Sequence, residues 1–535
     1  MVIPNQAARY VSILLISALV AALLCSASGA KDGDMFLFGT GNRRPLKFAG
    51  TWYQSDPAGL TALIDGYLQE AKASSAATKL KDALAHGQKL LAIVAPHAGY
   101  SYSGRTAACS YLAAQDKGIK RVFLLGPTHY KGFRGAGLTS DKCFATVYGD
   151  LQIDKAVVAD LRDNLLFSDQ TLAHHNEHSL ELQLAFIKST LGDVEIVPVL
   201  LGHLESETEA RLIADAIGRH LRDGDLIVVS SDFTHIGPRF GYEPFKSDFK
   251  ANLKALDMEA VSYLEKNDLD GFFKFYKKTD DTICGVYALS VLMALLPPQS
   301  RGTMLDYRTS QDFHEQEDSS VSYMSILFGS ETGWSQLHNK QEELLSQSEQ
   351  KSLIQLARHT LNDFVLKGVK DNFLEFKSSA RLKRPSGAFV TLYKRQSPDA
   401  KRSLRGCIGY VFPVKSLEQT IMENTISAAS MDPRFEPVSK EELEKLEIEI
   451  TVLSPPRPVA SYKDIRIGTD GILLKASGRQ SVFLPHVATE YGWTIEETLR
   501  QLSQKAGLAP DAWQKNARFE VFQGQSIEEK EQLLD

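Results

Sequence analysis

Apolar runs of strand length alternate with helix-length segments between residues 45 and 328, and this alternation constrains the fold of the 535-residue chain most strongly. The strand-like runs cover residues 89–96, 121–126, 194–201, 225–230 and 321–328. The helix-like segments cover residues 57–73, 105–116, 178–190, 205–222, 248–266 and 284–296. This spacing predicts an α/β domain, in which helices flank a layered, largely parallel or mixed sheet.

The chain changes character after residue 328. Residues 329–349 are polar and read as a linker. Beyond them, short strands such as GAFVTLYK, LEIEITVLS and GILLKAS mix with helices near 415–430 and 494–506. The pattern predicts a separate α+β domain at 350–535.

The first thirty residues have the features of a secretory signal peptide. A fifteen-residue apolar run without charges, VSILLISALVAALLC, is followed by the small residues SASGA, so we expect cleavage after Ala30. The α/β domain then occupies residues 31–328, and the protein is exported to the periplasm or another extracytoplasmic space. Alternatives are an uncleaved segment that anchors the chain in the membrane, or a lipoprotein modified at Cys25. The large Leu24 disfavours the lipoprotein reading.

The composition limits the classes of partner and the disulfides that we expect for this chain. A net charge of −6, without a stripe of basic and aromatic residues, argues against nucleic acid as a partner. Cleavage at Ala30 would leave Cys109, Cys143, Cys284 and Cys407, with no CxxC pair. Four cysteines do not make a disulfide scaffold, although an exported chain can form one bridge that the sequence does not assign.

Three histidines follow the ends of strand-like runs. They are His97 in KLLAIVAPHAGYSYSG, His129 in KRVFLLGPTHY and His235 in DLIVVSSDFTHIGPRFGY. Ligands of open α/β sheets bind outside the carboxyl ends of the strands, and imidazoles gathered there suit a metal ion. The alternative for His97 and His129 is a structural role in a turn.

Carboxylates near these histidines extend the candidate site. Asp232 lies three residues before His235, where it can orient the imidazole or serve as a ligand itself. Glu177 and Glu181 are four residues apart and would share one helix face, while His178 would either reach the site or cap that helix. Glu177 also suits the helix dipole, which is the purely structural interpretation.

Cys284 opens the apolar helix CGVYALSVLMALL. A thiol at the amino end of a helix has a lowered pKa, which makes it a better ligand or nucleophile. The alternative is a small buried residue.

Five motifs then identify a family. In chain order, PHAGYSYSG, LLGPTHY, NEHSLELQL, SSDFTHIGPRFGY and CGVYAL resemble the Memo family over residues 42–328. The resemblance implies the fold of class III extradiol dioxygenases, which hold non-haem iron at the ends of sheet strands. It also implies that His97, His129 and Cys284 bind iron, or alternatively copper, with Asp232 and His235 as catalytic pocket residues. Because Cys284 would replace a carboxylate ligand, dioxygenase activity does not follow from the fold.

The second domain carries a second resemblance. The segments SLRGCIGYVFP, MDPRFEPVSKEELEKLEIEITVLSPPRPV and FLPHVATEYGW resemble the AMMECR family over about residues 350–530. That family has its expected active site around LRGCIG, which makes Cys407 a candidate catalytic residue. Cys407 would form a nucleophile–base pair with His486 if the two were close, and is otherwise a buried cysteine.

The two resemblances together match proteins B and A of the AmmeMemoRadiSam system, whose third part is a radical SAM enzyme. This chain contains no CxxxCxxC, so the implied partner is a separate radical SAM protein. The leading functional hypothesis is a metal-dependent redox enzyme that acts on a small-molecule or peptide substrate. The main alternative is a non-catalytic metal- or peptide-binding protein, and a third is acyl or amide hydrolysis with His235 as base.

Overall fold

The computed structural model describes residues 43–164, 166–313, 318–334, 345–369, 379, 381–395, 402–413, 415–459, 461–515 and 517–532. The predicted signal peptide and residues 335–344 of the predicted linker lie outside these ranges. Within them, no helix is both long enough and apolar enough to cross a membrane.

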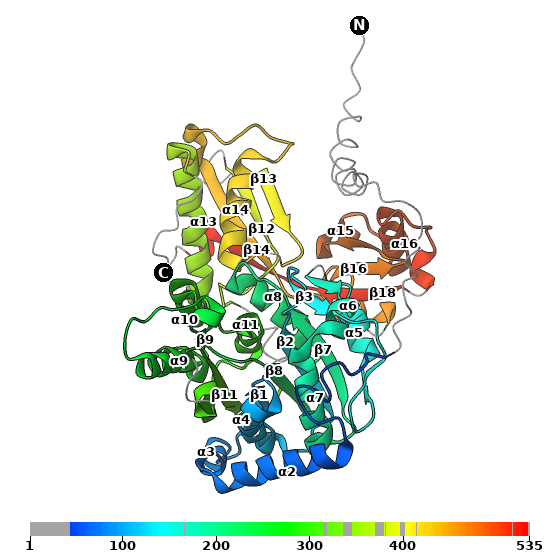
Figure 1. Ribbon diagram of the computed structural model, residues 1–535. Helices are drawn as coiled ribbons and strands as arrows, with labels where there is room; N and C mark the ends of the chain where they lie inside the picture. The colour runs from blue at the N-terminus through cyan, green and yellow to red at the C-terminus, as the bar shows by residue number, and fades with distance from the viewer. Residues whose placement is uncertain are drawn as a thin grey trace, which may run out of the picture. The chain divides into compact units, whose positions relative to one another are not determined.

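A mixed sheet forms the centre of the N-terminal domain (Figure 1), with the strand order β10-β11-β1-β8-β2-β7-β3-β6. Four neighbouring strands are mutually parallel and almost wholly buried: β1 (Lys89–Ala95), β8 (Asp225–Ser230), β2 (Arg121–Pro127) and β7 (Glu195–Leu201). On one side, β11 (Ser320–Ser330) and β10 (Arg301–Thr309) continue the sheet in antiparallel orientation. The predicted α/β layer structure with a mixed sheet is therefore confirmed.

The strands that the sequence pattern did not predict are short or lie at an edge of the sheet. They are β3 (Ala136–Leu138), β6 (Phe167–Asp169), β9 (His235–Ile236), the ribbon of β4 (Cys143–Phe144) and β5 (Leu151–Gln152), and the edge strand β10. The residues of β10 are mostly half-buried, which explains the lack of a continuous apolar run.

Helices cover the sheet and account for the remaining regular structure of this domain. Their bounds are α2 (Pro57–Ala73), α3 (Ser75–Ala83), α4 (Tyr100–Ala114), α5 (Lys155–Leu161), α6 (Thr171–Asn176), α7 (His178–Leu191), α8 (Glu207–Gly218), η1 (Pro238–Phe240), α9 (Phe249–Lys266), α10 (Leu269–Thr279), α11 (Val286–Leu295) and η2 (Ser310–Asp312). Local chemistry fixes α2, because the Asp56 side chain accepts from the backbone N–H of Gly59 and Pro57 takes the first helical position.

Helix α4 begins at Tyr100, five residues before the predicted start at residue 105. The chain ahead of residue 105 resembled a glycine-rich turn, but Gly104 lies inside the helix. A Cβ atom on Gly104 would stand 2.5 Å from Cε2 of Tyr67, so the glycine allows α4 to approach α2 closely.

The C-terminal domain contains two four-stranded sheets, β13-β12-β14-β19 and β15-β18-β16-β17, each with its own hydrophobic core. The first sheet combines β12 (Ala388–Lys394), β13 (Ser403–Tyr410), β14 (Leu446–Leu453) and β19 (Gly524–Glu528) with α13 (Gln347–Lys367), α14 (Leu417–Ser430), η3 (Lys440–Lys445) and α17 (Glu529–Gln532). The second combines β15 (Arg457–Val459), β16 (Gly471–Ala476), β17 (Arg479–Phe483) and β18 (Arg518–Phe522) with η4 (Tyr462–Asp464), α15 (Pro485–Glu490), α16 (Ile495–Lys505) and η5 (Ala512–Gln514). The predicted separate α+β domain is confirmed.

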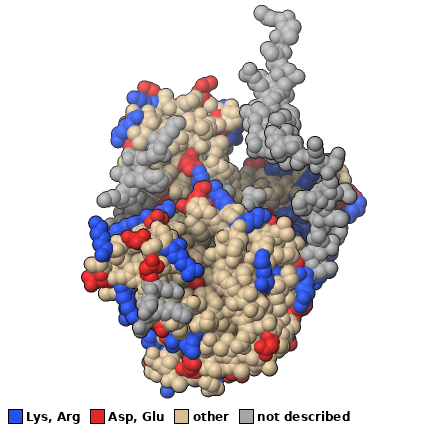
Figure 2. Space-filling model, viewed as in Figure 1, with Lys and Arg blue, Asp and Glu red and all other residues tan. Residues whose placement is uncertain are grey.

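Charges are interspersed on the face that Figure 2 shows. Lysine and arginine side chains lie among aspartates and glutamates, and no single basic field covers this face. The exclusion of nucleic acid as a partner remains a prediction from net charge.

Candidate metal centre

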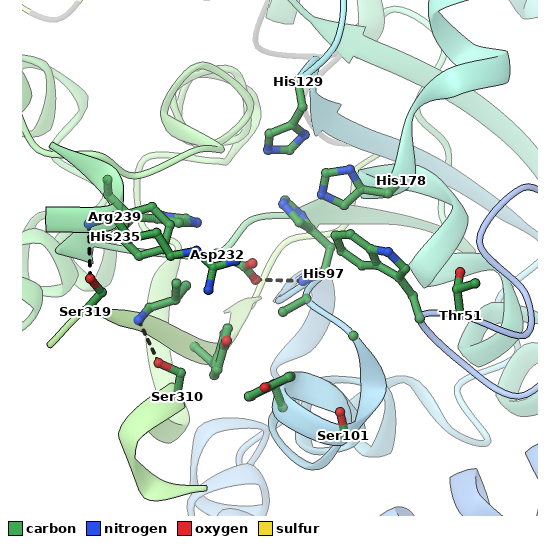
Figure 3. Close-up of a pocket in the computed structure, with 17 residues that line it drawn as sticks. Thr51, His97, Ser101, His129, His178, Asp232, His235, Arg239, Ser310 and Ser319 are labelled. Carbon is green, nitrogen blue, oxygen red and sulfur yellow. Dashed lines mark hydrogen bonds between the residues drawn. The ribbon is translucent and has the colours of Figure 1, made fainter. Parts of the chain in front are cut away.

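The carboxyl ends of β1, β2 and β8 open into one cavity of about 480 Å³. His97 and His129 each follow their strand by two residues, and Asp232 and His235 follow β8. In Figure 3 the imidazoles of His97, His129 and His178 face one another, with His235 and Arg239 across the cavity. The full lining consists of Thr51, Trp52, His97, Ala98, Gly99, Ser101, Tyr102, His129, His178, Asp232, His235, Arg239, Phe240, Ser310, Ser319, Val321 and Tyr323.

His97 is held in one tautomer by Ser230. Its Nδ1 lies 2.9 Å from Ser230 Oγ, and that hydroxyl donates its only hydrogen to the carbonyl of Ser179 at 2.6 Å. Ser230 Oγ therefore accepts from His97, as it does from Gln183 Nε2 at 2.8 Å. The proton of His97 sits on Nδ1, and the lone pair of Nε2 is left to face Cys284 Sγ at 3.3 Å.

His129 is held by Glu177 in the same way. Its Nδ1 lies 2.7 Å from Glu177 Oε1, and its backbone N–H donates to Oε2 at 2.6 Å. Burial alone would raise the pKa of Glu177, but the hydrogen bonds from His129 outweigh it and lower that pKa. A charged carboxylate accepts only, so Nδ1 of His129 donates to it, and Nε2 is the ring nitrogen left for a metal.

His235 is oriented by the backbone, which corrects the predicted pairing with Asp232. Its Nδ1 lies 2.8 Å from the carbonyl of Phe233 and 3.2 Å from that of Thr282, so Nδ1 again carries the proton. Burial lowers the pKa of His235 to about 4, which keeps the ring neutral near neutral pH.

Asp232 acts on a different neighbour. Its Oδ1 accepts from the backbone N–H of His97 at 2.8 Å, so this carboxyl supports the turn that presents His97. Burial raises the pKa of Asp232 to about 7.

Cys284 completes a group of three metal-binding side chains. The donor atoms of His97, His129 and Cys284 all lie within 4.8 Å of one another. Cys284 does not open α11, however, because the helix begins at Val286 with Gly285 as its N-cap. The predicted lowering of its pKa is wrong: burial first, and the charge of Asp232 second, raise the pKa of the Cys284 thiol. The backbone N–H of Asp232 donates to Sγ at 3.2 Å.

The structure separates the roles of Glu177 and Glu181. Glu177 is the N-cap of α7, where its side chain accepts from the backbone N–H of Ser179, so the predicted shared helix face is wrong. Glu181 is fully buried and fastens the segment 44–53: it accepts from Arg44 Nη1 at 2.7 Å, the backbone N–H groups of Lys47 and Phe48, and the hydroxyl of Tyr53. Glu181 therefore shapes the cavity wall that carries Trp52.

His178 reaches the site, which was one of the two roles predicted for it; the other was to cap the helix. Its ring centroid lies 4.3 Å from that of His129, 5.2 Å from that of His97 and 4.6 Å from that of Trp52. Its Nδ1 is buried without a hydrogen bond among the described residues. His129, Glu177 and His178 form a second group with metal-compatible spacing.

Sequence reasoning missed the residues that orient the imidazoles. Ser230 stands inside a motif that the sequence singled out, at the end of β8. Gln183 lies inside the motif NEHSLELQL, but its role was not visible there, because it acts on His97 through the distant Ser230. Thr282 had no local signal, because it contacts His235, which is distant along the chain. Arg239 lines the cavity from the motif that also contains Ser230, and Trp52 lines it from a segment without a recognisable pattern.

Cys407 lies in β13 and has different neighbours from those expected. Thr391 Oγ1 donates to Cys407 Sγ at 3.2 Å, and the backbone N–H of Cys407 donates to Asp432 Oδ2 at 2.9 Å. His486 is exposed in α15, beside the other sheet of the domain. The structure thus brings Thr391 and Asp432, not His486, to Cys407, and the predicted nucleophile–base pair is not supported.

The side chains of the cavity fit a transition-metal ion. Neutral imidazoles bind metals through the nitrogen without a proton, and their other nitrogen usually donates to a carboxylate, carbonyl or hydroxyl partner. His97, His129 and His235 all have that arrangement, and a thiol stands within reach of the first two. A bound cation is also the usual means of stabilising a thiolate.

Comparisons with known proteins agree with the two-domain organisation. The family model described as Memo-like protein matches residues 44–327, and the model described as AMMECR1 matches residues 354–527. Protein MEMO1 of Xenopus tropicalis is 33% identical over 295 residues, covering 52% of this chain and 95% of that protein. Protein MEMO1 of Homo sapiens is 31% identical, with the same coverage, and the memo-1 homolog of Caenorhabditis elegans is 30% identical, covering 53% of this chain and 82% of that protein.

Two solved structures of uncharacterized proteins also match. PH0010 from Pyrococcus horikoshii is 31% identical, with a TM-score of 0.30, over 35% of this chain and 94% of that chain. JW3007 from Escherichia coli K12 is 12% identical, with a TM-score of 0.31, over 45% of this chain and 99% of that chain.

Proposed function

The chain belongs to the Memo family, and from that premise we propose that its histidine cavity binds a redox-active metal ion and oxidises a small organic substrate. An AMMECR1 domain follows the Memo domain in the same chain. His97, His129 and Cys284 would hold the metal, which we propose to be iron, with copper as the alternative. Imidazole suits both metals, whereas a thiolate favours a softer ion such as Cu(I).

One observation carries this proposal: three imidazoles reach one cavity with their Nδ1 protons already bound elsewhere. The partners of Nδ1 are a hydroxyl for His97, a carboxylate for His129 and two carbonyls for His235. Each ring is therefore fixed in orientation and offers Nε2 as its remaining acceptor. Three histidines with purely structural roles would not need to share this arrangement.

The residues around the metal position have separable tasks. Iron, when bound, supplies redox and Lewis-acid chemistry toward dioxygen and an organic substrate. The neutral His235 can accept a proton at Nε2 from a substrate hydroxyl. Asp232 holds the backbone of His97, and Trp52 and Phe240 provide apolar walls that exclude water from the cavity.

The remaining expectations belong to the same proposal. We propose that the AMMECR1 domain serves the same pathway, with Cys407 as its reactive residue and a radical SAM protein as partner. We also propose that the protein is exported, with the N-terminal segment removed or retained as a membrane anchor. The fusion of the two domains and the apolar run in the first thirty residues support these points.

Metal analysis joined to an oxygen electrode tests the function. The chain from Lys31 is purified, its bound metals are measured, and oxygen uptake is followed with a panel of catechols and other hydroxylated aromatics. Iron together with substrate-dependent uptake is the expected result. Metal without uptake across the panel would favour the second candidate, a metal- or peptide-binding protein that uses the same cavity. Absence of any metal affinity would overturn the proposed redox function and the metal-binding form of the second candidate.

A further inference from the structure

A polar cluster behind the segment 231–236 contains two buried carboxyl groups. Asp257 of α9 is fully buried, and Asp281, in the turn between α10 and α11, is 3% exposed. A buried charged carboxylate is costly unless hydrogen bonds or a cation compensate it. The contacts of the two groups therefore indicate which one is charged.

Asp257 has the environment of a charged carboxylate. Thr234 Oγ1 lies 2.7 Å from its Oδ1. The hydroxyls of Ser322 and Tyr307 lie 2.6 Å and 2.9 Å from its Oδ2. Three hydroxyl donors directed at one carboxyl group favour its ionised form.

Asp281 has the opposite environment. Its Oδ1 is buried with no hydrogen-bond partner among the described residues, and its Oδ2 lies 3.2 Å from Thr234 Oγ1. Thr234 has one hydroxyl hydrogen, which its shorter contact with Asp257 uses. The contact between Thr234 and Asp281 is a hydrogen bond only if Asp281 is a carboxylic acid that donates from Oδ2.

The charges nearby do not change this assignment. No described lysine or arginine forms an ion pair with Asp257 or Asp281. The titratable side chains that interact with the pair or with its partner Tyr307 are Tyr242, Tyr307 and Asp312, and none is a cation. The pair is therefore expected to hold one negative charge and one proton.

The cluster contacts the segment that brings two residues into the cavity. Thr234 stands between Asp232 and His235 in the chain and is bound to both carboxyl groups. Thr282, next to Asp281, accepts from the backbone N–H of His235 at 2.8 Å and donates to its carbonyl at 2.7 Å. The turn that carries Asp281 therefore holds the backbone of His235 in place.

We propose that Asp281 is a positioning residue: as a neutral acid it fastens the segment 231–236 to the turn between α10 and α11, and loss of its proton weakens this attachment. Burial raises the pKa of Asp281 to about 7 and that of Asp257 to about 6, so the shared proton is lost as the pH rises through neutrality. A carboxyl pKa that is raised by folding stabilises the protein fully below the unfolded value near 4. That contribution is lost as the pH rises through about 7.

Thermal unfolding of the full chain between about pH 5 and about pH 8 tests the proposal. Asp281→Asn keeps the shape and offers an amide donor that mimics the acid but cannot ionise. We expect its Tm to match that of the unmodified chain at the acidic end and to exceed it at the alkaline end. Asp280→Asn is the matched control, because Asp280 is exposed and has a φ of 54° that asparagine tolerates. Its Tm should follow the unmodified chain throughout.

Amide hydrogen exchange of a peptide covering residues 228–238 provides the second measurement. At the alkaline pH, exchange should be slower in Asp281→Asn than in the unmodified chain, and equal at the acidic pH. If Asp281→Asn fails to fold, the carboxylic-acid carbonyl band of an Asp232→Asn variant, followed by infrared titration, replaces it and should vanish near neutrality; the variant removes the signal of Asp232, whose pKa is also raised to about 7. Equal Tm profiles with equal exchange, or no titrating acid band, would overturn the proposal. None of these readouts depends on metal binding.

Discussion

Each of the two domains contains a cysteine among polar groups. The contrast between Cys284 and Cys407 shows how a candidate binding site differs from a satisfied network, in which the polar groups are hydrogen-bonded to one another. Around Cys284, the imidazoles of His97 and His129 each have Nδ1 bound to a polar partner, and Nε2 of His97 lies 3.3 Å from the thiol. Around Cys407, the polar groups satisfy one another: Thr391 donates to the thiol, and the backbone N–H of Cys407 is paired with Asp432. Imidazole nitrogens directed at the cavity distinguish the first region, which is the one that we propose to bind a metal.

Ion pairs sharpen the same contrast. Near Cys407, Arg434 binds Asp432 and Arg405 binds Glu442, so cation and anion neutralise each other in place. In the cavity, no described arginine or lysine forms an ion pair with Asp232 or Glu177; imidazoles and backbone N–H groups surround these carboxyls instead. A cation added to the cavity would therefore meet acceptors, whereas one added near Cys407 would have to displace existing partners.

Removing His97 should have the largest effect. His97→Ala deletes a nitrogen that faces Cys284 and His129, so we expect metal binding to be abolished, as measured by metal content after purification and by calorimetric titration. His203→Ala is the control, because His203 is exposed and its Nδ1 contacts the hydroxyl of Tyr287. Full metal retention in His97→Ala would show that His97 is not a metal ligand, and the contrast between the regions around Cys284 and Cys407 would then fail.

Breaking the buried ion pair behind the cavity wall should have the next largest effect. Arg44→Met leaves Glu181 buried without its cation, since both side chains are fully inaccessible. We expect the free energy of unfolding of the Memo domain to fall by about 3–5 kcal/mol, measured by denaturant titration. Lys515→Met, which breaks an exposed pair with Asp511, should cost far less stability, because solvent screens that pair. Equal losses in the two variants would show that burial does not govern this interaction.

Removing the charge behind His129 should weaken metal binding without abolishing it. Glu177→Gln keeps a carbonyl oxygen for the helix cap but loses the charged acceptor of Nδ1, so we expect metal affinity to fall about 10–100-fold in calorimetric titration. Glu207→Gln, at the first position of α8, serves as control and should leave the affinity unchanged. A complete loss of metal in Glu177→Gln would instead make Glu177 a ligand, as its spacing to His178 permits.

The alternation of apolar runs was enough to predict the sheet and most of its helices. Buried parallel strands and amphipathic helices leave periodic patterns, and helix α2 has the predicted bounds of residues 57–73. The edge strand β10 left no such pattern, because its residues are mostly half-buried and a proline-rich break precedes it. Local patterns therefore revealed the layers of the fold but not their edges.

The candidate site was predictable in its members but not in its contacts. Strand ends bring His97 and His129 together, because β1 and β2 run parallel to the same intervening strand, β8. The partners that fix the imidazoles come from elsewhere: Gln183 acts from α7, and Thr282 from the turn before α11. A spacing of three residues suggested that Asp232 holds His235, whereas the backbone turns Asp232 toward His97. Side-chain direction in an irregular segment depends on its tertiary hydrogen bonds, which sequence spacing does not encode.

Replacing the thiol of Cys407 should give the smallest effect, and its contrast with the same replacement at Cys284 gives the sharpest test of the comparison. Cys407→Ser removes a sulfur that accepts one hydrogen bond from Thr391, so we expect a stability change of at most about 1 kcal/mol and an unchanged metal affinity. Cys284→Ser, an identical substitution, should reduce metal affinity strongly, because a hydroxyl is a poor substitute for a thiolate toward iron or copper. Both variants are compared by calorimetric metal titration and denaturant unfolding. If Cys407→Ser lost metal as Cys284→Ser does, the satisfied network around Cys407 would have to open when metal binds, and unpaired acceptors would no longer distinguish the two regions.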